Sequence, residues 1–162
     1  VDHREGAVAL ELDQLERVLQ GVGLLEVMHV SGKLPESVRS KTAGEVMRGD
    51  VHHLKQTDTL QDALKLIQLE SHSTFPVVDG DKVFQGVILK EDLYECVKTS
   101  DEGLETPIAD IDLRKFPTTA LDAPVPEVVE ALLRGGTSKV VVVDGEQKLQ
   151  GIITLIDLMA EG

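Results

Sequence analysis

The stretch from Ser138 to Asp157, SKVVVVDGEQKLQGIITLID, decides the fold. Its four consecutive valines, Val140 to Val143, are β-branched and predict a strand that is buried on both faces. The Asp-Gly pair at 144–145 then predicts a tight turn, because glycine readily adopts the positive φ that such turns need. A second apolar run at 149–153 predicts the returning strand of a hairpin.

The same pattern occurs 65 residues earlier, in the stretch from Ser73 to Asp92, STFPVVDGDKVFQGVILKED. Identical residues recur at this offset without a gap, and they include Val77 and Val142, Asp79 and Asp144, Gln85 and Gln150, and Asp92 and Asp157. The chain therefore contains an internal duplication. Upstream of Ser73, Thr42 would align with Thr106 only if one residue were inserted or deleted between there and Ser73.

Composition and charge exclude several classes of function. The 162 residues are 41% hydrophobic and 28% charged, which is typical of a globular protein of one or two small domains. A net charge of -13 and an aromatic content of 2%, without tryptophan, argue against nucleic acid and anionic membrane surfaces as partners. No apolar run approaches the roughly 20 residues that span a bilayer.

A single cysteine, Cys96, excludes an intrachain disulfide and fits a reducing, cytoplasmic setting. Its closing-helix position and lack of basic neighbours predict a packing role. The sequence begins without methionine, so we expect a fragment of a longer protein.

Residues 1–40 are predicted to form an N-terminal helical segment and linker. Apolar residues spaced by four and three positions predict a helix over about 7–20, and they are Val8, Leu12, Leu15, Leu19 and Val22. This stripe packs either on its own domain or on a partner subunit. Residues 24–30 are compatible with a short helix or an extended segment, and 31–35 with a turn or linker.

Residues 41–100 and 101–162 are predicted to be two repeats with the order β-α-β-β-α. Each first helix carries one apolar face, formed by Leu60, Ala63, Leu64 and Ile67 in repeat one and by Val125, Val128, Val129 and Leu132 in repeat two. Extended pieces precede these helices near 51–54 and 116–119, and closing helices are expected at 90–97 and 155–160. The fold class is α/β (α+β), with the two sheets packed face to face in pseudo-twofold symmetry. We expect six residues to be largely buried: Val77, Val78, Ile88, Val142, Val143 and Ile153.

The duplicated pattern resembles a tandem pair of CBS domains, called a Bateman module. The matching motifs are TAGEVM (42–47), FPVVDG with QGVILKED in repeat one, and KVVVVDG with QGIITLID in repeat two. The resemblance covers about residues 41–159. It implies a non-catalytic regulatory module that binds AMP, ADP, ATP or S-adenosylmethionine between the repeats, requires no cofactor, and often forms homodimers attached to enzymes, transporters or chloride channels.

By this resemblance, Asp157 receives the ribose hydroxyls and Thr154 supports the ribose or phosphate. A carboxylate accepts hydrogen bonds with both oxygens, which suits two vicinal hydroxyls. Further ligand contacts are expected from Lys139 to a phosphate, from Thr118 and Thr119 to the adenine edge, and from Val142 and Ile152 to the adenine faces. The same Thr-x-x-Asp pattern is also a helix-capping pattern, so the two roles remain open.

Repeat one departs from the motif, because Leu89 stands where repeat two has Thr154. Asp92 is retained as a candidate ligand-binding residue, but we expect a weak, altered or empty site there and a mainly structural role for this acid. The histidines at 52, 53 and 72 lack the spacing of a metal site. No phosphate loop or catalytic triad is present, so we expect no enzyme.

Two other functions compete with the sensing of an adenosine ligand. One is a ligand-free dimerisation or interaction domain of a membrane transporter or channel, on the cytosolic face and without membrane insertion of its own. The other is a divalent-cation (Mg²⁺) sensor. The scattered acidic residues make the cation sensor the weakest of the three.

Overall fold

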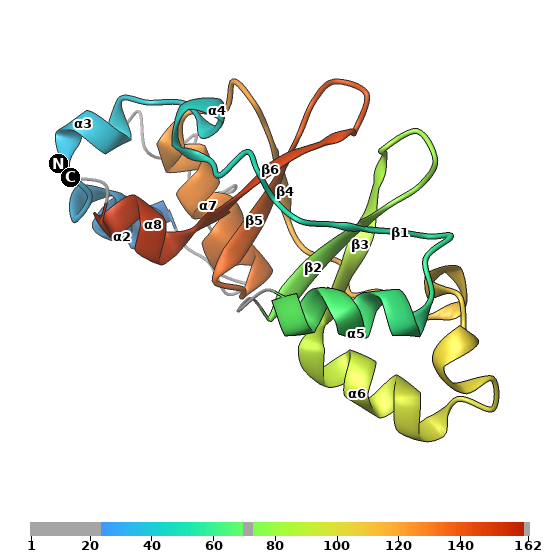
Figure 1. Cartoon of the computed structure of the whole chain (residues 1–162). Helices are drawn as coiled ribbons and strands as arrows, with labels where there is room; N and C mark the ends of the chain where they lie inside the picture. The colour runs from blue at the N-terminus through green and yellow to red at the C-terminus, as the bar shows by residue number, and fades with distance from the viewer. Residues whose placement is uncertain (1–23, 70–72, 161–162) are drawn as a thin grey trace, which may run out of the picture. The chain divides into compact units, whose positions relative to one another are not determined.

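The computed structural model describes residues 24–69 and 73–160, and the helix predicted over 7–20 lies outside them (Figure 1). Three helices precede the first repeat: α2 (Leu24–Gly32), α3 (Glu36–Arg39) and α4 (Ala43–Val46). The segment 24–30 is therefore helical. The turn expected at 31–35 begins only after Gly32, and Leu34 within it is buried.

Both repeats have the predicted β-α-β-β-α order. Repeat one consists of β1 (Leu54–Lys55), α5 (Leu60–Leu69), β2 (Thr74–Val78), β3 (Phe84–Leu89) and α6 (Lys90–Thr99). Repeat two consists of β4 (Thr118–Ala120), α7 (Val125–Gly135), β5 (Lys139–Val143), β6 (Leu149–Thr154) and α8 (Leu155–Ala160). Two short 3₁₀ turns, η1 (Gly103–Glu105) and η2 (Ile108–Asp110), connect them. Each repeat forms one three-stranded sheet, with the orders β1-β2-β3 and β4-β5-β6.

The apolar faces predicted for α5 and α7 form the two cores. In repeat one, α5 and α6 lie on the same side of the sheet and bury Leu60, Ala63 and Ile67 against Phe75, Val77 and Ile88 (Figure 1). In repeat two, the four predicted residues of α7 are buried against Val140, Val142 and Ile153. All six residues expected to be buried are at most 4% exposed.

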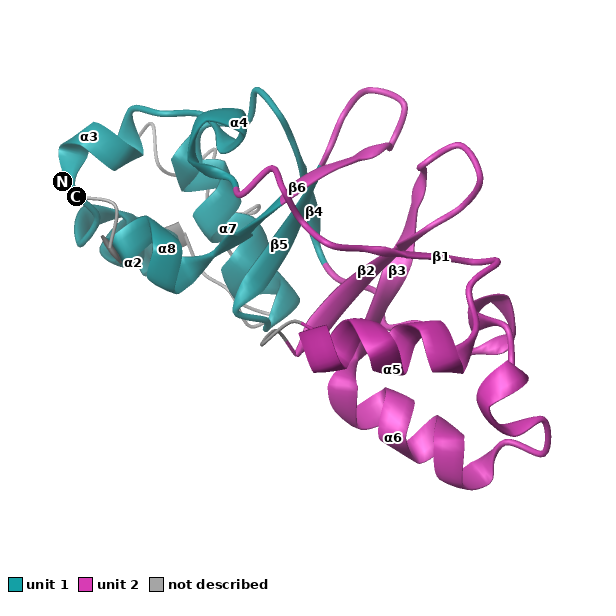
Figure 2. Cartoon of the chain, viewed as in Figure 1, with its two compact units in different colours: residues 1–47, 117–142, 152–162 teal, residues 48–116, 143–151 magenta. Residues whose placement is uncertain are grey.

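The compact units of the chain do not coincide with the repeats (Figure 2). Of the described residues, unit 1 contains 24–47, 117–142 and 152–160, and unit 2 contains 48–69, 73–116 and 143–151. The segment before repeat one thus packs on repeat two, where α2 and α3 contact α7. In the same way, the segment before repeat two packs on repeat one, where η1 contacts α5 and α6.

The segments that precede the two repeats, called here the docked segments, make equivalent backbone contacts with the repeat on which each packs. In unit 1, Ala43 N donates to Ala123 O at 2.8 Å; in unit 2, Ile108 N donates to Asp58 O at 2.7 Å. The isolated bridges Thr42–Pro124 and Thr59–Pro107 are related in the same manner. Every pair is shifted by the same 65 residues, so the repeat register continues upstream without a gap. No insertion or deletion is therefore needed, and Thr42 is equivalent to Pro107, not to Thr106.

The hairpin turns are also equivalent, but glycine does not supply their positive φ. Lys82 (φ 67°) and Gln147 (φ 66°) hold the left-handed conformation, and Gly80 and Gly145 do not. In each turn the aspartate side chain fixes the loop by hydrogen bonds. The amides of Asp81 and Val83 donate to Asp79 Oδ1, with N···O distances of 2.8 and 3.0 Å. Asp144 makes the matching bonds in repeat two. The expectation that glycine provides the special backbone conformation is thus wrong.

Among the described residues, no helix has both the length and the apolar character needed to cross a membrane.

Candidate functional site

The junction of β6 and α8 brings Thr154 and Asp157 together. Thr154 is the last residue of β6, and its Oγ1 accepts the amide of Asp157 at 3.0 Å, as an N-cap residue does. Both residues are half-buried, and the Oδ2 oxygen of Asp157 is buried. The hydroxyl therefore caps α8 while it stands beside the carboxylate, so the capping pattern is present at the predicted ligand site.

The other predicted contacts of the β5–β6 hairpin lie on different faces. Val142 is fully buried among the helix-side residues of the core, so it cannot stack on an adenine ring, and this prediction is wrong. Ile152 is next to the core residue Ile153 in β6 and therefore lies on the opposite face of the sheet, where it is 8% exposed. Lys139 is half-buried at the start of β5.

The two threonines of β4 line a separate cavity of about 520 Å³ in unit 1. Thr118 is exposed and Thr119 half-buried, and the rest of the lining includes Glu127, Glu130 and Arg134 of α7. Arg134 Nη2 donates to Glu130 Oε1 at 2.9 Å. This cavity brings together Thr118 and Thr119 but is not lined by Thr154 or Asp157.

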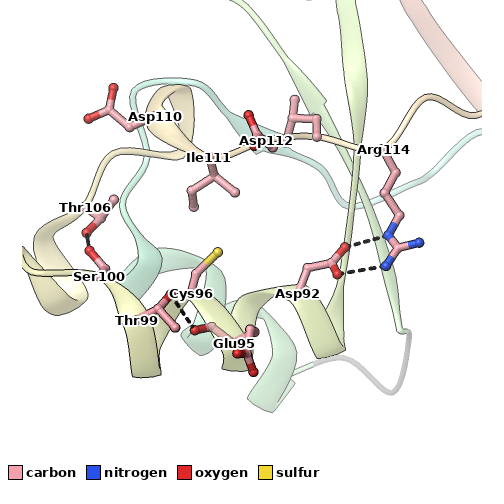
Figure 3. A pocket seen from close by; sticks show the side chains of 11 residues that line it. Asp92, Glu95, Cys96, Thr99, Ser100, Thr106, Asp110, Ile111, Asp112 and Arg114 are labelled. Carbon is pink, nitrogen blue, oxygen red and sulfur yellow. Dashed lines mark hydrogen bonds and ion pairs between the residues drawn. The ribbon is translucent and has the colours of Figure 1, made fainter.

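In repeat one, Asp92 is held by an arginine. Arg114 Nε donates to Asp92 Oδ2 at 2.8 Å, and Arg114 Nη2 donates to Oδ1 at 3.0 Å (Figure 3). The Leu89 amide donates to Oδ2 at 3.4 Å, whereas the Leu89 side chain has no oxygen with which to cap α6. These bonds, led by that from Arg114, lower the pKa of Asp92 below its usual value despite partial burial.

Arg114 is positioned by its backbone as well as by Asp92. Its amide donates to Val87 O and its carbonyl accepts the Val87 amide, both at 2.8 Å, so the segment around it pairs with β3. The neighbouring Leu113 lies so close to Gly86 that a Cβ on this glycine would be 2.8 Å from the Leu113 Cβ. Gly86 has φ +156°. A residue without a side chain is thus needed where the segment crosses β3.

A cavity of about 530 Å³ lies between α6 and the segment 106–114, with the Asp92–Arg114 pair at one end (Figure 3). Cys96 points into it. Burial raises the pKa of the Cys96 thiol, and the carboxylates of Asp92, Glu95 and Asp112 raise it further. The thiol therefore stays protonated near neutral pH.

Within residues 24–69 and 73–160, no group of three or more His, Cys, Asp or Glu residues is arranged to hold a metal ion. His53 is exposed, with its Nδ1 at 3.4 Å from Val51 O.

Sequence reasoning missed Arg114, which lies 22 residues beyond Asp92. One signal was available in the sequence. An arginine lies shortly before the first strand of each repeat, at Arg48 and at Arg114, although these two positions are 66 and not 65 residues apart. That signal does not reveal which acid Arg114 contacts, because the contact depends on how the segment crosses β3.

Comparison with known proteins identifies relatives of this chain. It is 28% identical over 145 residues to inosine-5'-monophosphate dehydrogenase of Methanocaldococcus jannaschii, a match that covers 87% of this chain and 28% of that protein. It is 25% identical over 119 residues to the magnesium and cobalt efflux protein CorC of Salmonella typhimurium, covering 70% of this chain and 38% of CorC. The chain thus spans less than half the length of these curated relatives.

Solved structures share the fold. The CBS domain of a bacterial CNNM/CorC family Mg²⁺ transporter, in complex with ATP, has a TM-score of 0.66 at 21% identity and covers 84% of this chain and 94% of its own. A hemolysin-like CBS protein of Oenococcus oeni has a TM-score of 0.64 at 25% identity, covering 77% and 92%. CBSX2 in complex with AMP has a TM-score of 0.62 at 23% identity, covering 75% and 96%.

The family model of the CBS domain matches the chain twice, over residues 43–99 and 108–161. These segments follow the duplicated β-α-β-β-α order of the structure. The chain therefore belongs to the CBS-domain family and carries a pair of CBS domains.

Proposed function

We propose that this CBS pair is a non-catalytic regulatory module that binds an adenosine-containing ligand through repeat two. Asp157 receives the ribose hydroxyls and Thr154 supports the ribose or phosphate. The observation that carries the proposal is the junction itself, where the Thr154 hydroxyl, 3.0 Å from the Asp157 amide, holds the helix start and the carboxylate beside the end of β6.

The chemistry of this pair suits a nucleoside. A carboxylate accepts the two donated hydrogen bonds of a cis-diol, and such charge-assisted bonds are stronger than neutral ones. The ATP and AMP complexes of structurally similar CBS domains support AMP, ADP, ATP or S-adenosylmethionine as the ligand class.

Among the eight residues predicted to contact a ligand, Thr154 and Asp157 are the strongest candidates, because the Asp157 amide donates a hydrogen bond to the Thr154 hydroxyl. Ile152 and Lys139 lie on the same hairpin and remain secondary candidates. Thr118 and Thr119 line a different cavity and fit this site less well.

The regulated protein is proposed to be a transporter or an enzyme, attached or associated, with this module on the cytoplasmic side. The likeness to CorC and to the CBS domain of a Mg²⁺ transporter supports a transporter, and the likeness to a dehydrogenase supports an enzyme.

A thermal-unfolding screen with AMP, ADP, ATP and S-adenosylmethionine tests the proposal. A ligand at about 100 times its Kd stabilises the folded state by roughly 2.7 kcal/mol, which shifts the melting temperature clearly. Inorganic triphosphate, which lacks the ribose and the base, serves as the control for nonspecific anion effects. If none of the four adenosine ligands raises the melting temperature at millimolar concentration, the proposal fails.

A second candidate function is dimerisation, and exposed apolar residues on the closing helices support a homodimer. Ile156 and Met159 on α8 are 76% and 53% exposed, and Tyr94 on α6 is 45% exposed. Burying such residues on association is favourable at about 25 cal/mol per Å². Sedimentation should show a dimer that Ile156→Asp shifts toward the monomer. A strictly monomeric wild-type chain at high concentration would refute the dimer.

A Mg²⁺ sensor receives less support, because the described residues contain no metal-binding group of acids and histidines.

A further inference from the structure

We propose that Arg114 acts as an internal ligand of Asp92 and thereby prevents repeat one from binding a nucleoside. The proposal rests on the proposed function in one respect: Asp92 occupies the position in repeat one that Asp157 occupies in repeat two.

The hydrogen-bonding capacity of Asp92 carries the first step. A carboxylate offers about four lone-pair sites, two on each oxygen. On Oδ2, Arg114 Nε and the Leu89 amide take both, at 2.8 and 3.4 Å. On Oδ1, Arg114 Nη2 takes one at 3.0 Å. One site remains, whereas a cis-diol that binds with both hydroxyls needs two.

The strengths of the competing bonds carry the second step. The guanidinium presents two parallel N–H donors to the two carboxylate oxygens, which is the same fork that a cis-diol offers with two O–H donors. The arginine bonds join two ionised groups, so they are stronger than bonds from neutral hydroxyls. A nucleoside therefore cannot displace Arg114 from Asp92 by its ribose alone.

The placement of Arg114 carries the third step. Although the side chain is 56% exposed, its backbone is held to Val87 by two bonds of 2.8 Å. The close approach of Leu113 to Gly86 holds the same segment against β3. The arginine is thus held near Asp92 before it pairs, which reduces the entropy that an exposed ion pair ordinarily loses.

Leu89 adds a second obstacle, because it replaces the hydroxyl of Thr154 with a larger apolar side chain. A functional site in repeat one therefore requires two changes, Arg114→Ala to release Asp92 and Leu89→Thr to restore the hydroxyl.

The test uses the full chain in the Asp157→Asn background, so that repeat two does not contribute. Adenosine is the probe, because it has the cis-diol and no phosphate whose charge would respond to the loss of an arginine. Titration calorimetry compares the parent, which is this background with Leu89→Thr added to it, and the opened variant, which carries Arg114→Ala as well, so that the two proteins differ only at residue 114. We expect the opened variant to bind adenosine at least tenfold more tightly than the parent.

Two controls identify the cause of the gain. 2′-Deoxyadenosine, which lacks the cis-diol, should show no gain, and adding Asp92→Asn to the opened variant should abolish it. Equal binding by the parent and the opened variant, including no binding by either, would overturn the proposal. So would a gain that survives Asp92→Asn.

Folding and the proposed function are checked separately. Circular dichroism and thermal melting establish that each variant is folded, and Arg114→Gln, which keeps part of the side-chain stem, replaces Arg114→Ala if the latter unfolds. The same gain is expected from either variant, and its absence in a folded one overturns the proposal. Failure of the proposed function appears elsewhere, as an unchanged adenosine affinity when Asp157→Asn alone is compared with the wild-type chain.

Discussion

The two strand-to-helix junctions of this CBS pair occupy equivalent positions in their repeats but differ in chemistry. At the β6–α8 junction, the Thr154 hydroxyl accepts the Asp157 amide. At the β3–α6 junction, Leu89 offers no hydroxyl, and Asp92 is paired with Arg114 by two bonds. The aspartate is present at both junctions, but its neighbours differ: a threonine hydroxyl in repeat two and an arginine in repeat one. We propose that these neighbours decide whether the carboxylate binds a ligand or another residue of the protein.

The largest expected effect concerns ligand affinity at the two aspartates. Asp157→Asn should weaken binding of the ligand found by thermal screening at least about tenfold, or roughly 1.5–3 kcal/mol, the contribution of hydrogen bonds to a charged group. Asp92→Asn is the matched control and should change affinity little. Calorimetric titration of both variants measures the difference. Equal small effects at the two positions would mean that both acids only stabilise helix starts.

Gly86 should be sensitive to substitution because residues 113–114 pack directly against it in repeat one. A Cβ at this position would lie 2.8 Å from the Leu113 Cβ and 3.1 Å from the Arg114 carbonyl oxygen. Gly86→Ala should therefore lower the free energy of unfolding by roughly 1–3 kcal/mol, as overpacking does. Gly80→Ala, which meets nothing within 4 Å, should stay within about 0.5 kcal/mol. Urea denaturation measures both, and similar values would contradict the close contact.

The hairpin turns, in contrast to the junctions, should respond alike in the two repeats. Lys82 and Gln147 adopt a left-handed conformation that costs an L-residue about 1–2 kcal/mol. Glycine avoids this cost but loses roughly 0.5–1 kcal/mol through its greater freedom in the unfolded chain. Lys82→Gly and Gln147→Gly should each stabilise the fold by up to about 1 kcal/mol. Asp81→Gly, in the same turn without positive φ, should not stabilise it in thermal melting.

The smallest expected effect is the pH dependence that Asp92 contributes. Its pKa in the folded protein is lowered, chiefly by the hydrogen bond from Arg114, so the pairing stabilises the fold above the ordinary carboxyl pKa of about 3.9. This stabilisation is lost as the pH falls through the lower pKa of the folded state. The difference in unfolding free energy between the wild type and Asp92→Asn should thus be constant near neutrality and shrink below about pH 4.

Solvent screening should keep this effect small, because Arg114 is 56% exposed. Repeating the acid titration of stability at high salt should shrink the difference further. A difference that instead grows toward low pH would show that Asp92 is not stabilised as a carboxylate.

The sequence by itself determined the elements of this fold. The duplication follows from identical residues at a fixed offset of 65 positions. The two hairpins and the helical faces of α5 and α7 follow from short-range patterns of apolar and turn residues, and the six buried residues follow from the predicted strands. The sequence also showed that the two junctions differ, because Leu89 stands in repeat one where repeat two has Thr154, while both have an aspartate three residues later. In these features the local signal and the final structure agree.

Only the tertiary structure decided which face each valine of β5 occupies. Four β-branched residues in a row show no alternation of apolar and polar residues, so the pattern could not predict that Val142 faces the helices and not the opposite face of the sheet. The positive φ at Lys82 and Gln147 likewise follows from how Asp79 and Asp144 fold their turns, not from the position of glycine.

The sequence also did not predict that the segment before each repeat packs on the other repeat. Residues 24–47 pack on repeat two and the segment 103–114 packs on repeat one, so the contacts join positions far apart in the chain. This exchange places Arg114 on Asp92, across 22 residues and without a shared motif. Periodicity reports only which side of an element is apolar, whereas the choice among partners for that side depends on the packing of the whole unit.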